Sequence, residues 1–200
     1  AAGKGTLARR LAEHLALRYL DTGLIYRAVG LAVAQAGGDA DDPVAAEAAA
    51  RALDPASFND PALRGEQAGA AASKVAAIPG VRTALVEFQR AFAATAPGAV
   101  LDGRDIGTVI CPRAEVKLFV TASLEKRAER RLKELLDKGV SAIRERVLQD
   151  MKERDERDSA RSVAPLVPAD DAVILDTSDL DADAAFAAAL SIISQRRRAD

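Results

Sequence analysis

Hydrophobic residues recur at helical spacing along most of the chain, interrupted by capping residues, glycines and prolines. Leu7, Leu11 and Leu15 share one face, which predicts a first helix that ends near Leu17. The segment 54–65, with its two prolines, is predicted to be irregular and exposed. Five further helices are predicted from the same spacing and its end signals: from Leu24 towards Gly37, from Pro43 to about Leu53, at 66–77, at 81–94, and a last helix through Phe186, Leu190 and Ile193.

Short apolar runs alternate with these helices and predict strands at 18–20, 99–101, 116–120 and 172–175. Alternation of this kind is typical of an α/β protein with a mainly parallel sheet that helices cover on both faces. Ligands bind beyond the carboxyl ends of such strands. Asp21, Asp102, Gly103 and Thr121 are therefore expected at the binding edge.

Composition limits the function classes. The chain has 200 residues, 49% of them hydrophobic and only 4% aromatic, which suits one compact domain with closely packed helices. A formal charge of -2 argues against bulk binding to nucleic acid. A single cysteine, Cys111, and a single histidine, His14, exclude an internal disulfide and a metal cluster, so no metal-ligating residues are predicted. No long apolar span or signal peptide is visible, which favours a cytoplasmic protein without a membrane partner.

The first six residues, Ala-Ala-Gly-Lys-Gly-Thr, have the composition of a phosphate-binding loop at a helix N-terminus. Gly3 and Gly5 let successive N–H groups face an anion, and Lys4 adds a positive charge beside the phosphates. The opening glycine and the preceding strand of the full pattern do not stand before Ala1, and the hydroxyl comes one place late, at Thr6. On these residues alone, a plain loop before a surface helix remains an alternative.

Two turns that follow strands concentrate polar residues. In Asp21-Thr22-Gly23, Arg27 falls one helical turn after Gly23 and could reach an anion there, although a helix cap with a solvated arginine is an alternative. Asp102-Gly103-Arg104-Asp105 has more charge than a plain turn needs, which favours a functional role.

A third group of charged residues lies in the run 154–161. In a helix, Arg154, Arg157, Asp158 and Arg161 would project from one face as a row of guanidinium groups with one carboxylate. A solvated face with internal ion pairs is the alternative. Phosphoryl transfer needs cations around the transferring group, so this row supports the phosphate-binding interpretation of the first residues.

Five segments in this order closely resemble bacterial cytidylate kinase and together span the chain: GKGT (3–6), LDTGLIYR (20–27), ASKVAAIPGVR (72–82), LDGRDIGT (101–108) and RSVAPL (161–166). The resemblance implies transfer of the γ-phosphoryl group of ATP, with Mg²⁺, to CMP or dCMP in pyrimidine metabolism. It also implies a parallel-sheet nucleoside monophosphate kinase fold with a helical lid, small-molecule partners only and a monomer.

The resemblance also implies residue roles. ATP would be bound by Ala2, Gly3, Lys4, Gly5, Thr6, Arg130 and Arg131. CMP would be bound by Thr22, Arg27, Ser73, Arg82, Asp102, Arg104, Asp105, Arg154, Asp158 and Arg161, with Ser73 and Arg82 on the cytosine edge. Catalysis would depend on Lys4, Arg104, Arg154 and Arg157, while Asp102 would orient Mg²⁺-bound waters or arginines.

One kinase domain, 1–200, is expected, with a CMP-binding segment at about 37–95 and a lid at about 132–159. The family has a central strand and the opening glycine before Ala1, so this chain is expected to lack its first strand. Without it, the chain is expected to express poorly or to bind ATP weakly. Restoring an apolar strand ahead of Ala1 is expected to rescue both properties. The segment 53–73 is shorter than in well-known members.

Two alternatives remain. A related kinase acting on UMP, AMP or a small alcohol would keep the loop and lid arginines but change the acceptor pocket. A non-catalytic nucleotide-binding module would not need the row of arginines.

Overall fold

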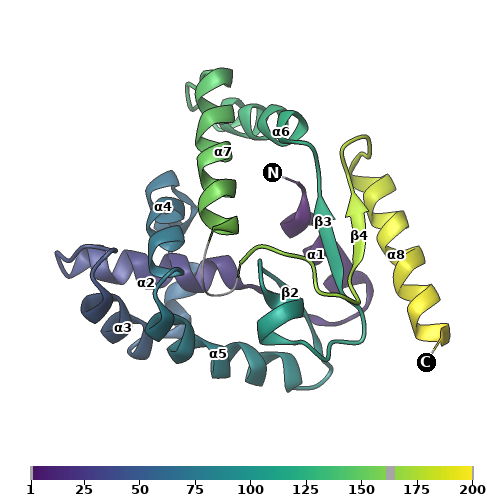
Figure 1. Cartoon of the computed structure of the whole chain (residues 1–200), viewed down its shortest axis with the longest axis horizontal. Coiled ribbons are helices and arrows are strands. Elements are labelled where there is room, and N and C mark those ends of the chain that lie inside the picture. The colour runs from purple at the N-terminus through teal and green to yellow at the C-terminus, as the bar shows by residue number, and fades with distance from the viewer. Residues whose placement is uncertain (1, 161–164, 200) are drawn as a thin grey trace. The chain divides into compact units, whose positions relative to one another are not determined.

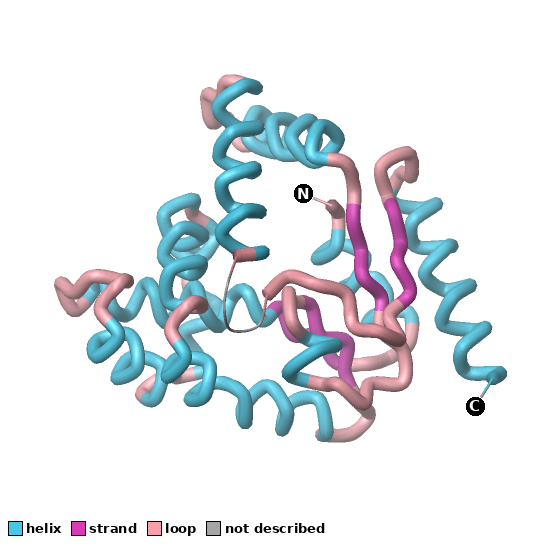
Figure 2. Tube along the Cα trace, in the orientation of Figure 1, coloured by secondary structure: helices cyan, strands magenta, loops and turns pink. Residues whose placement is uncertain are grey.

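The computed structural model describes residues 2–160 and 165–199, and for Glu66, Arg157 and Ala199 it describes the backbone alone. The chain forms two compact units. The middle unit is Tyr19–Gly103, and the terminal unit combines Ala1–Arg18 with Arg104–Asp200. Each unit contains its own pair of strands (Figures 1 and 2). Each also has its own cluster of buried hydrophobic residues.

The terminal unit is built on two short parallel strands. β3 (Leu118–Thr121) and β4 (Val173–Asp176) pair in register, from Leu118 opposite Val173 to Thr121 opposite Asp176. Helix α8 runs beside β4 in Figure 1, and the buried cluster joins α1, β4 and α8 through Leu7, Leu175 and Ile193. The helices of this unit are α1 (Lys4–His14), α6 (Leu124–Asp137), α7 (Arg144–Ser159) and α8 (Ala182–Ala199).

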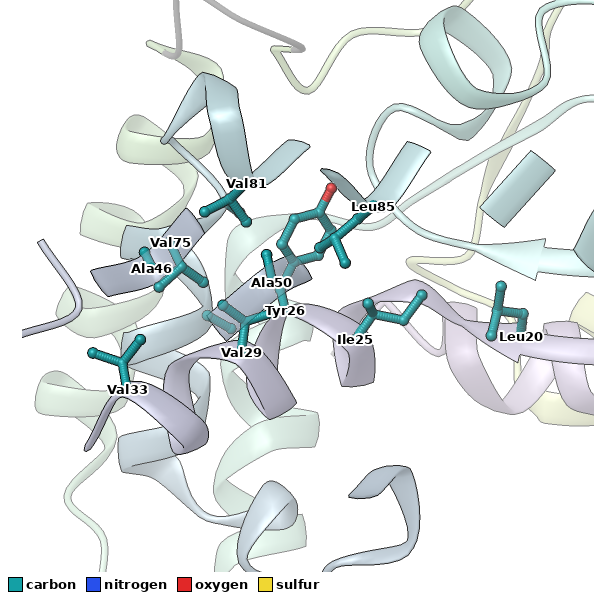
Figure 3. Packing of buried hydrophobic residues seen from close by; sticks show 12 residues of the cluster. Leu20, Ile25, Tyr26, Val29, Val33, Ala46, Ala50, Val75, Val81 and Leu85 are labelled. Atoms are coloured by element: carbon teal, nitrogen blue, oxygen red, sulfur yellow. The ribbon is translucent and has the colours of Figure 1, made fainter. Parts of the chain in front are cut away.

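The middle unit is mostly helical, with β1 (Arg18–Asp21) paired to β2 (Ala99–Asp102). Its helices are α2 (Thr22–Gln35), α3 (Pro43–Arg51), α4 (Glu66–Val75) and α5 (Pro79–Ala94). Figure 3 shows Ile25, Val29 and Val33 following one another along α2, as residues four apart do on a helix. A Cβ on Gly30 would lie 2.7 Å from the Cβ of Ala71, so glycine at this position lets α2 and α4 pack closely.

Aspartate–proline pairs start three helical segments of the middle unit. In each pair the aspartate carboxylate accepts a hydrogen bond of 2.8–2.9 Å from the N–H two residues later, in Asp42-Pro43, Asp54-Pro55 and Asp60-Pro61. Two of these segments are 3-10 turns, Pro55–Asn59 and Pro61–Arg64. The prediction that 54–65 is irregular was therefore wrong, because these caps order the chain as short turns. The predicted exposure is confirmed for most of the segment, with Leu63, only 1% exposed, as the exception.

Two helix boundaries also differ from the predictions. α1 ends at His14 and not near Leu17, because Ala16 takes a left-handed conformation with φ 52° and the chain turns back, with Leu17 N–H donating to the Ala12 carbonyl at 2.8 Å. α5 begins at Pro79 and not at Val81, since proline fits the first helical position.

The α/β class with parallel pairing is confirmed, but in the described residues the strands form two pairs, β1–β2 and β3–β4, where one sheet was predicted. An apolar run of four residues identifies a strand without specifying which strand it pairs with, so this difference lay beyond the sequence pattern. Within the described part of the chain, no helix is both long and apolar enough to span a bilayer.

Candidate active site

The N-terminus of α1 has the backbone expected of a phosphate-binding turn. Gly3 caps the helix with φ 78°, a left-handed conformation that glycine adopts without strain. Apart from its chain neighbours, no atom of the described residues lies within 4 Å of where its Cβ would be. Lys4, Gly5 and Thr6 form the first turn of the helix, which contains no acidic residue. N–H groups without intrahelical partners, the helix dipole and the Lys4 ammonium thus all favour an anion at this end.

Thr177, directly after β4, links this turn to the strands. Its hydroxyl lies 3.0 Å from the carbonyl oxygens of both Ala2 and Thr121, and it accepts a hydrogen bond of 3.2 Å from Arg130 Nη1. Thr177 is 2% exposed. The sequence indicated only a turn at Asp176-Thr177-Ser178. A hydroxyl directly after a strand, at the edge of the sheet where ligands bind, was nevertheless a signal that pointed to Thr177.

Arg130 and Arg131, both expected at the ATP site, have different surroundings. Arg130 of α6 also donates to the carbonyl oxygen of Leu180 at 3.1 Å, so it joins α6 to the segment after β4. Arg131 forms an ion pair of 3.0 Å with Glu134 on the same helix. A hydrogen bond from Lys138, together with a smaller effect of Arg131, lowers the pKa of Glu134.

Three expected substrate-binding residues come together in the terminal unit. Asp158 of α7 is 2% exposed and forms an ion pair with Arg104, and Arg154 Nε lies 4.0 Å from the same carboxylate oxygen. A buried carboxylate between two guanidinium groups holds both in place while leaving a net positive charge. The side chain of Arg157 and the whole of Arg161 lie outside the described residues.

The motif Asp102-Gly103-Arg104-Asp105 contains the boundary between the two units. Asp102 ends β2 and is buried, while Asp105 is buried at the start of a π-helical turn, Ile106–Ile110. The turn is closed by Cys111 N–H, which donates to the Ile106 carbonyl at 2.7 Å. The predicted concentration of charge after a strand is present, but the helical turn that follows was not foreseen.

In the middle unit, the start of α2 is fixed to the end of β2. The Thr22 hydroxyl donates to the carbonyl oxygen of Asp102 at 2.8 Å, and the Asp21 carboxylate caps α2 by accepting from Gly23 N–H at 2.9 Å. Arg27, one turn further along, donates to the carbonyl oxygen of Leu63 at 2.8 Å. The capping interpretation of Asp21 is confirmed, and Arg27 is half-buried in place of being solvated.

The two residues expected to read the base, Ser73 of α4 and Arg82 of α5, are both buried in the middle unit. Arg82 is 8% exposed, donates to the Ala76 carbonyl at 3.2 Å, and places its guanidinium carbon 5.7 Å from the centre of the Tyr26 ring. Contact with an aromatic face and a backbone acceptor restricts this side chain to one orientation, as a base-reading arginine requires.

A pair that sequence reasoning missed joins α6 to α7. Arg127 contacts both carboxylate oxygens of Asp155, at 3.0 and 2.7 Å, and donates through Nε to the Ala122 carbonyl at 3.0 Å. No local pattern relates residues 28 positions apart on two helices, so the sequence offered no sign of this pair.

A cleft of about 160 Å³ lies beside α2 and α3. None of the predicted site residues lines it.

A glycine-capped helix start with a lysine, a parallel pair of strands and a buried carboxylate paired with arginines are typical of α/β proteins that bind phosphate groups. The chain belongs to the cytidylate kinase family, whose model matches residues 1–195. It is 68% identical to a cytidylate kinase of Paramagnetospirillum magneticum, over 98% of this chain and 95% of the relative. Cytidylate kinases of Rhodospirillum rubrum and Xanthobacter autotrophicus are 60% and 61% identical, each over 98% of this chain and 94% of the relative.

Proposed function

We propose that this chain transfers the γ-phosphoryl group of ATP to CMP and dCMP, giving CDP and dCDP. The observation that carries the proposal is its similarity to cytidylate kinases along almost the whole chain, including both described units. Its substrates are small molecules, and it acts as a monomer without a nucleic-acid or membrane partner.

ATP is held in this proposal by Ala2, Gly3, Lys4, Gly5 and Thr6, with Arg130 and Arg131 in supporting roles. The fit rests on the left-handed Gly3 and the open space around it, which allow phosphate oxygens to approach backbone N–H groups. Thr6 and Asp102 would supply oxygen atoms of the kind that Mg²⁺ and its waters prefer. The ion would accompany ATP and would neutralise charge on the phosphate oxygens.

CMP is held in this proposal by the residues that the family resemblance indicates. Ser73 and Arg82 donate to the cytosine edge, and Thr22, Arg27 and Asp102 bind the rest of the nucleotide. The acceptor phosphate and sugar are bound by Arg104, Asp105, Arg154, Asp158 and Arg161. Positioned hydrogen bonds of this type reject bases whose donors and acceptors are reversed.

Catalysis in this proposal consists of positioning and charge stabilisation and requires no dominant general base. Lys4, Arg104, Arg154 and Arg157 surround the transferring phosphoryl group with positive charge. The segment at about 132–159 is the lid, which excludes water and suppresses ATP hydrolysis, and the segment at about 37–95 binds CMP, within one kinase domain, 1–200. The lid segment begins inside α6 and includes α7.

An ADP-release assay with four acceptors tests the proposed specificity. CMP and dCMP should be phosphorylated, whereas UMP and AMP should give turnover at least about tenfold lower, because their base edges do not match the donors of Ser73 and Arg82. Faster turnover with UMP or AMP than with CMP would contradict the proposed acceptor.

A further inference from the structure

Thr177 makes more contacts than the pairing of β3 with β4 requires. Its backbone N–H already donates to the Thr121 carbonyl at 2.8 Å, which continues the ladder beyond the last paired residues. The side-chain hydroxyl is therefore not needed to hold Thr121. Its remaining partners are the carbonyl oxygen of Ala2 and the guanidinium of Arg130.

Both of these partners belong to parts of the chain that the proposed function assigns to ATP. Ala2 directly precedes Gly3, the left-handed cap from which the first turn of α1 starts. Arg130 lies on α6, and the same guanidinium donates to the Leu180 carbonyl beyond β4. One buried hydroxyl thus contacts two distant parts of the chain. Ala2, directly before the phosphate-binding turn, is 175 positions away, and Arg130 of α6 is 47 positions away.

We propose that Thr177 is a positioning residue for the ATP site: its hydroxyl fixes the Ala2 peptide to the end of β4 and holds Arg130 at the same point. This inference rests on the proposed function. The N–H groups of the first turn of α1 can receive phosphate oxygens only in the direction that the Ala2–Gly3 peptide gives them, so a hydroxyl that orients this peptide sets ATP affinity.

Replacement of the hydroxyl by a methyl group tests the proposal. Thr177→Val keeps the size and branching of the side chain but removes the hydroxyl partner of Ala2, while Arg130 keeps its hydrogen bonds to the backbone carbonyls of residue 177 and Leu180. The Kd and the KM for ATP should therefore rise about tenfold through the loss at Ala2. The KM for CMP should stay within about twofold, since the partners of the Thr177 hydroxyl in the described part of the chain, Ala2, Thr121 and Arg130, are not proposed CMP-binding residues. Thr177→Ser, which keeps the hydroxyl, should restore ATP affinity.

Thr83→Val is the matched control. It also removes one hydroxyl, which donates to the Pro79 carbonyl at 3.1 Å on the exposed side of α5, and it should leave ATP binding unchanged. Should the valine variant fail to fold in thermal melts, Thr177→Ala against Thr177→Ser gives the same comparison of a side chain with and without hydroxyl. Equal ATP affinity with and without the hydroxyl, or equal losses in the serine and valine variants, would overturn the proposal.

ATP titration without CMP separates this inference from the proposed reaction. A wild-type protein that binds ATP but does not phosphorylate CMP would contradict the assignment of CMP as the phosphoryl acceptor. The Kd values of the Thr177 variants for ATP would still test whether Thr177 positions the ATP site. A wild-type protein that binds no ATP would overturn both.

Discussion

Lys4 is the residue on which the donor site depends most. It lies in the first turn of α1 directly after the Gly3 cap, where its charge adds to the helix dipole. Lys4→Ala should lower kcat at least about 100-fold, because charge on the transferring phosphoryl group loses its nearest cation, while the melting temperature stays within about 3 °C. Arg9→Ala removes an exposed cation from the same helix and should leave kcat unchanged. Near-normal turnover of Lys4→Ala would contradict the phosphate-binding role.

Arg82 carries the prediction on base choice. Because its guanidinium is held by the Ala76 carbonyl and the Tyr26 ring, it presents fixed donors that ATP does not use in the proposed arrangement. Arg82→Ala should raise the KM for CMP about tenfold or more, with the KM for ATP within about twofold. Steady-state kinetics with each substrate varied in turn measures both constants. Equal increases would place Arg82 in a structural role.

Asp171 gives the terminal unit a predictable response to acid. Hydrogen bonding from Lys117, whose side chain is nearly buried, lowers the pKa of Asp171 below its ordinary value of 3.8. A lowered folded-state pKa adds stability that is present above pH 3.8 and is lost as the pH falls through the folded-state pKa. Thermal melts of Asp171→Asn should therefore fall below wild type at pH 5–7, and the difference should shrink below pH 3.8. A difference that persists unchanged in acid, or an equal effect of Asp170→Asn, would contradict this account.

At the scale of elements, the sequence predicted the helices whose ends are set by residues close by in the chain. Helices were found wherever an apolar face met a capping aspartate or proline, as at Asp42-Pro43. The failures occurred where a single backbone angle or a short turn decides the outcome. The left-handed Ala16 carries no sequence signal, since alanine rarely adopts this conformation, and the 3-10 turns after Asp54 and Asp60 are too short for helical periodicity to show.

The contact between α6 and α7 supplies a prediction at this scale. Arg127 and Asp155 form a two-point ion pair that is partly shielded from water, so a double-mutant cycle with Arg127→Ala and Asp155→Ala should give a coupling of about 1 kcal/mol. The exposed pair Lys126–Glu129 within α6, at 3.6 Å, should give at most about 0.5 kcal/mol. Urea unfolding measures both cycles. Equal coupling energies would mean that Arg127 does not join the two helices.

At the scale of the whole molecule, sequence motifs suggested many candidate site residues but not how the fold holds them. The sequence indicated Arg154 and Asp158 together on one helical face and Arg104 separately, and the structure brings Arg104 to Asp158 across 54 positions. The position of Thr177 directly after a strand was visible in the sequence, but its contact with Ala2 could not be predicted, because a hydroxyl and a carbonyl 175 positions apart leave no periodic pattern. The division into two strand pairs was missed for the same reason, since pairing partners are set by tertiary packing.

The central claim is that this chain moves a phosphoryl group from ATP to a cytidine monophosphate. Incubation with ATP labelled at the γ-phosphate and with CMP, followed by separation of the nucleotides, tests it most directly. We predict that the label appears in CDP with the wild-type protein and that its rate of appearance falls at least about 100-fold with Lys4→Ala. Label found only in inorganic phosphate, or left entirely in ATP, would contradict the account.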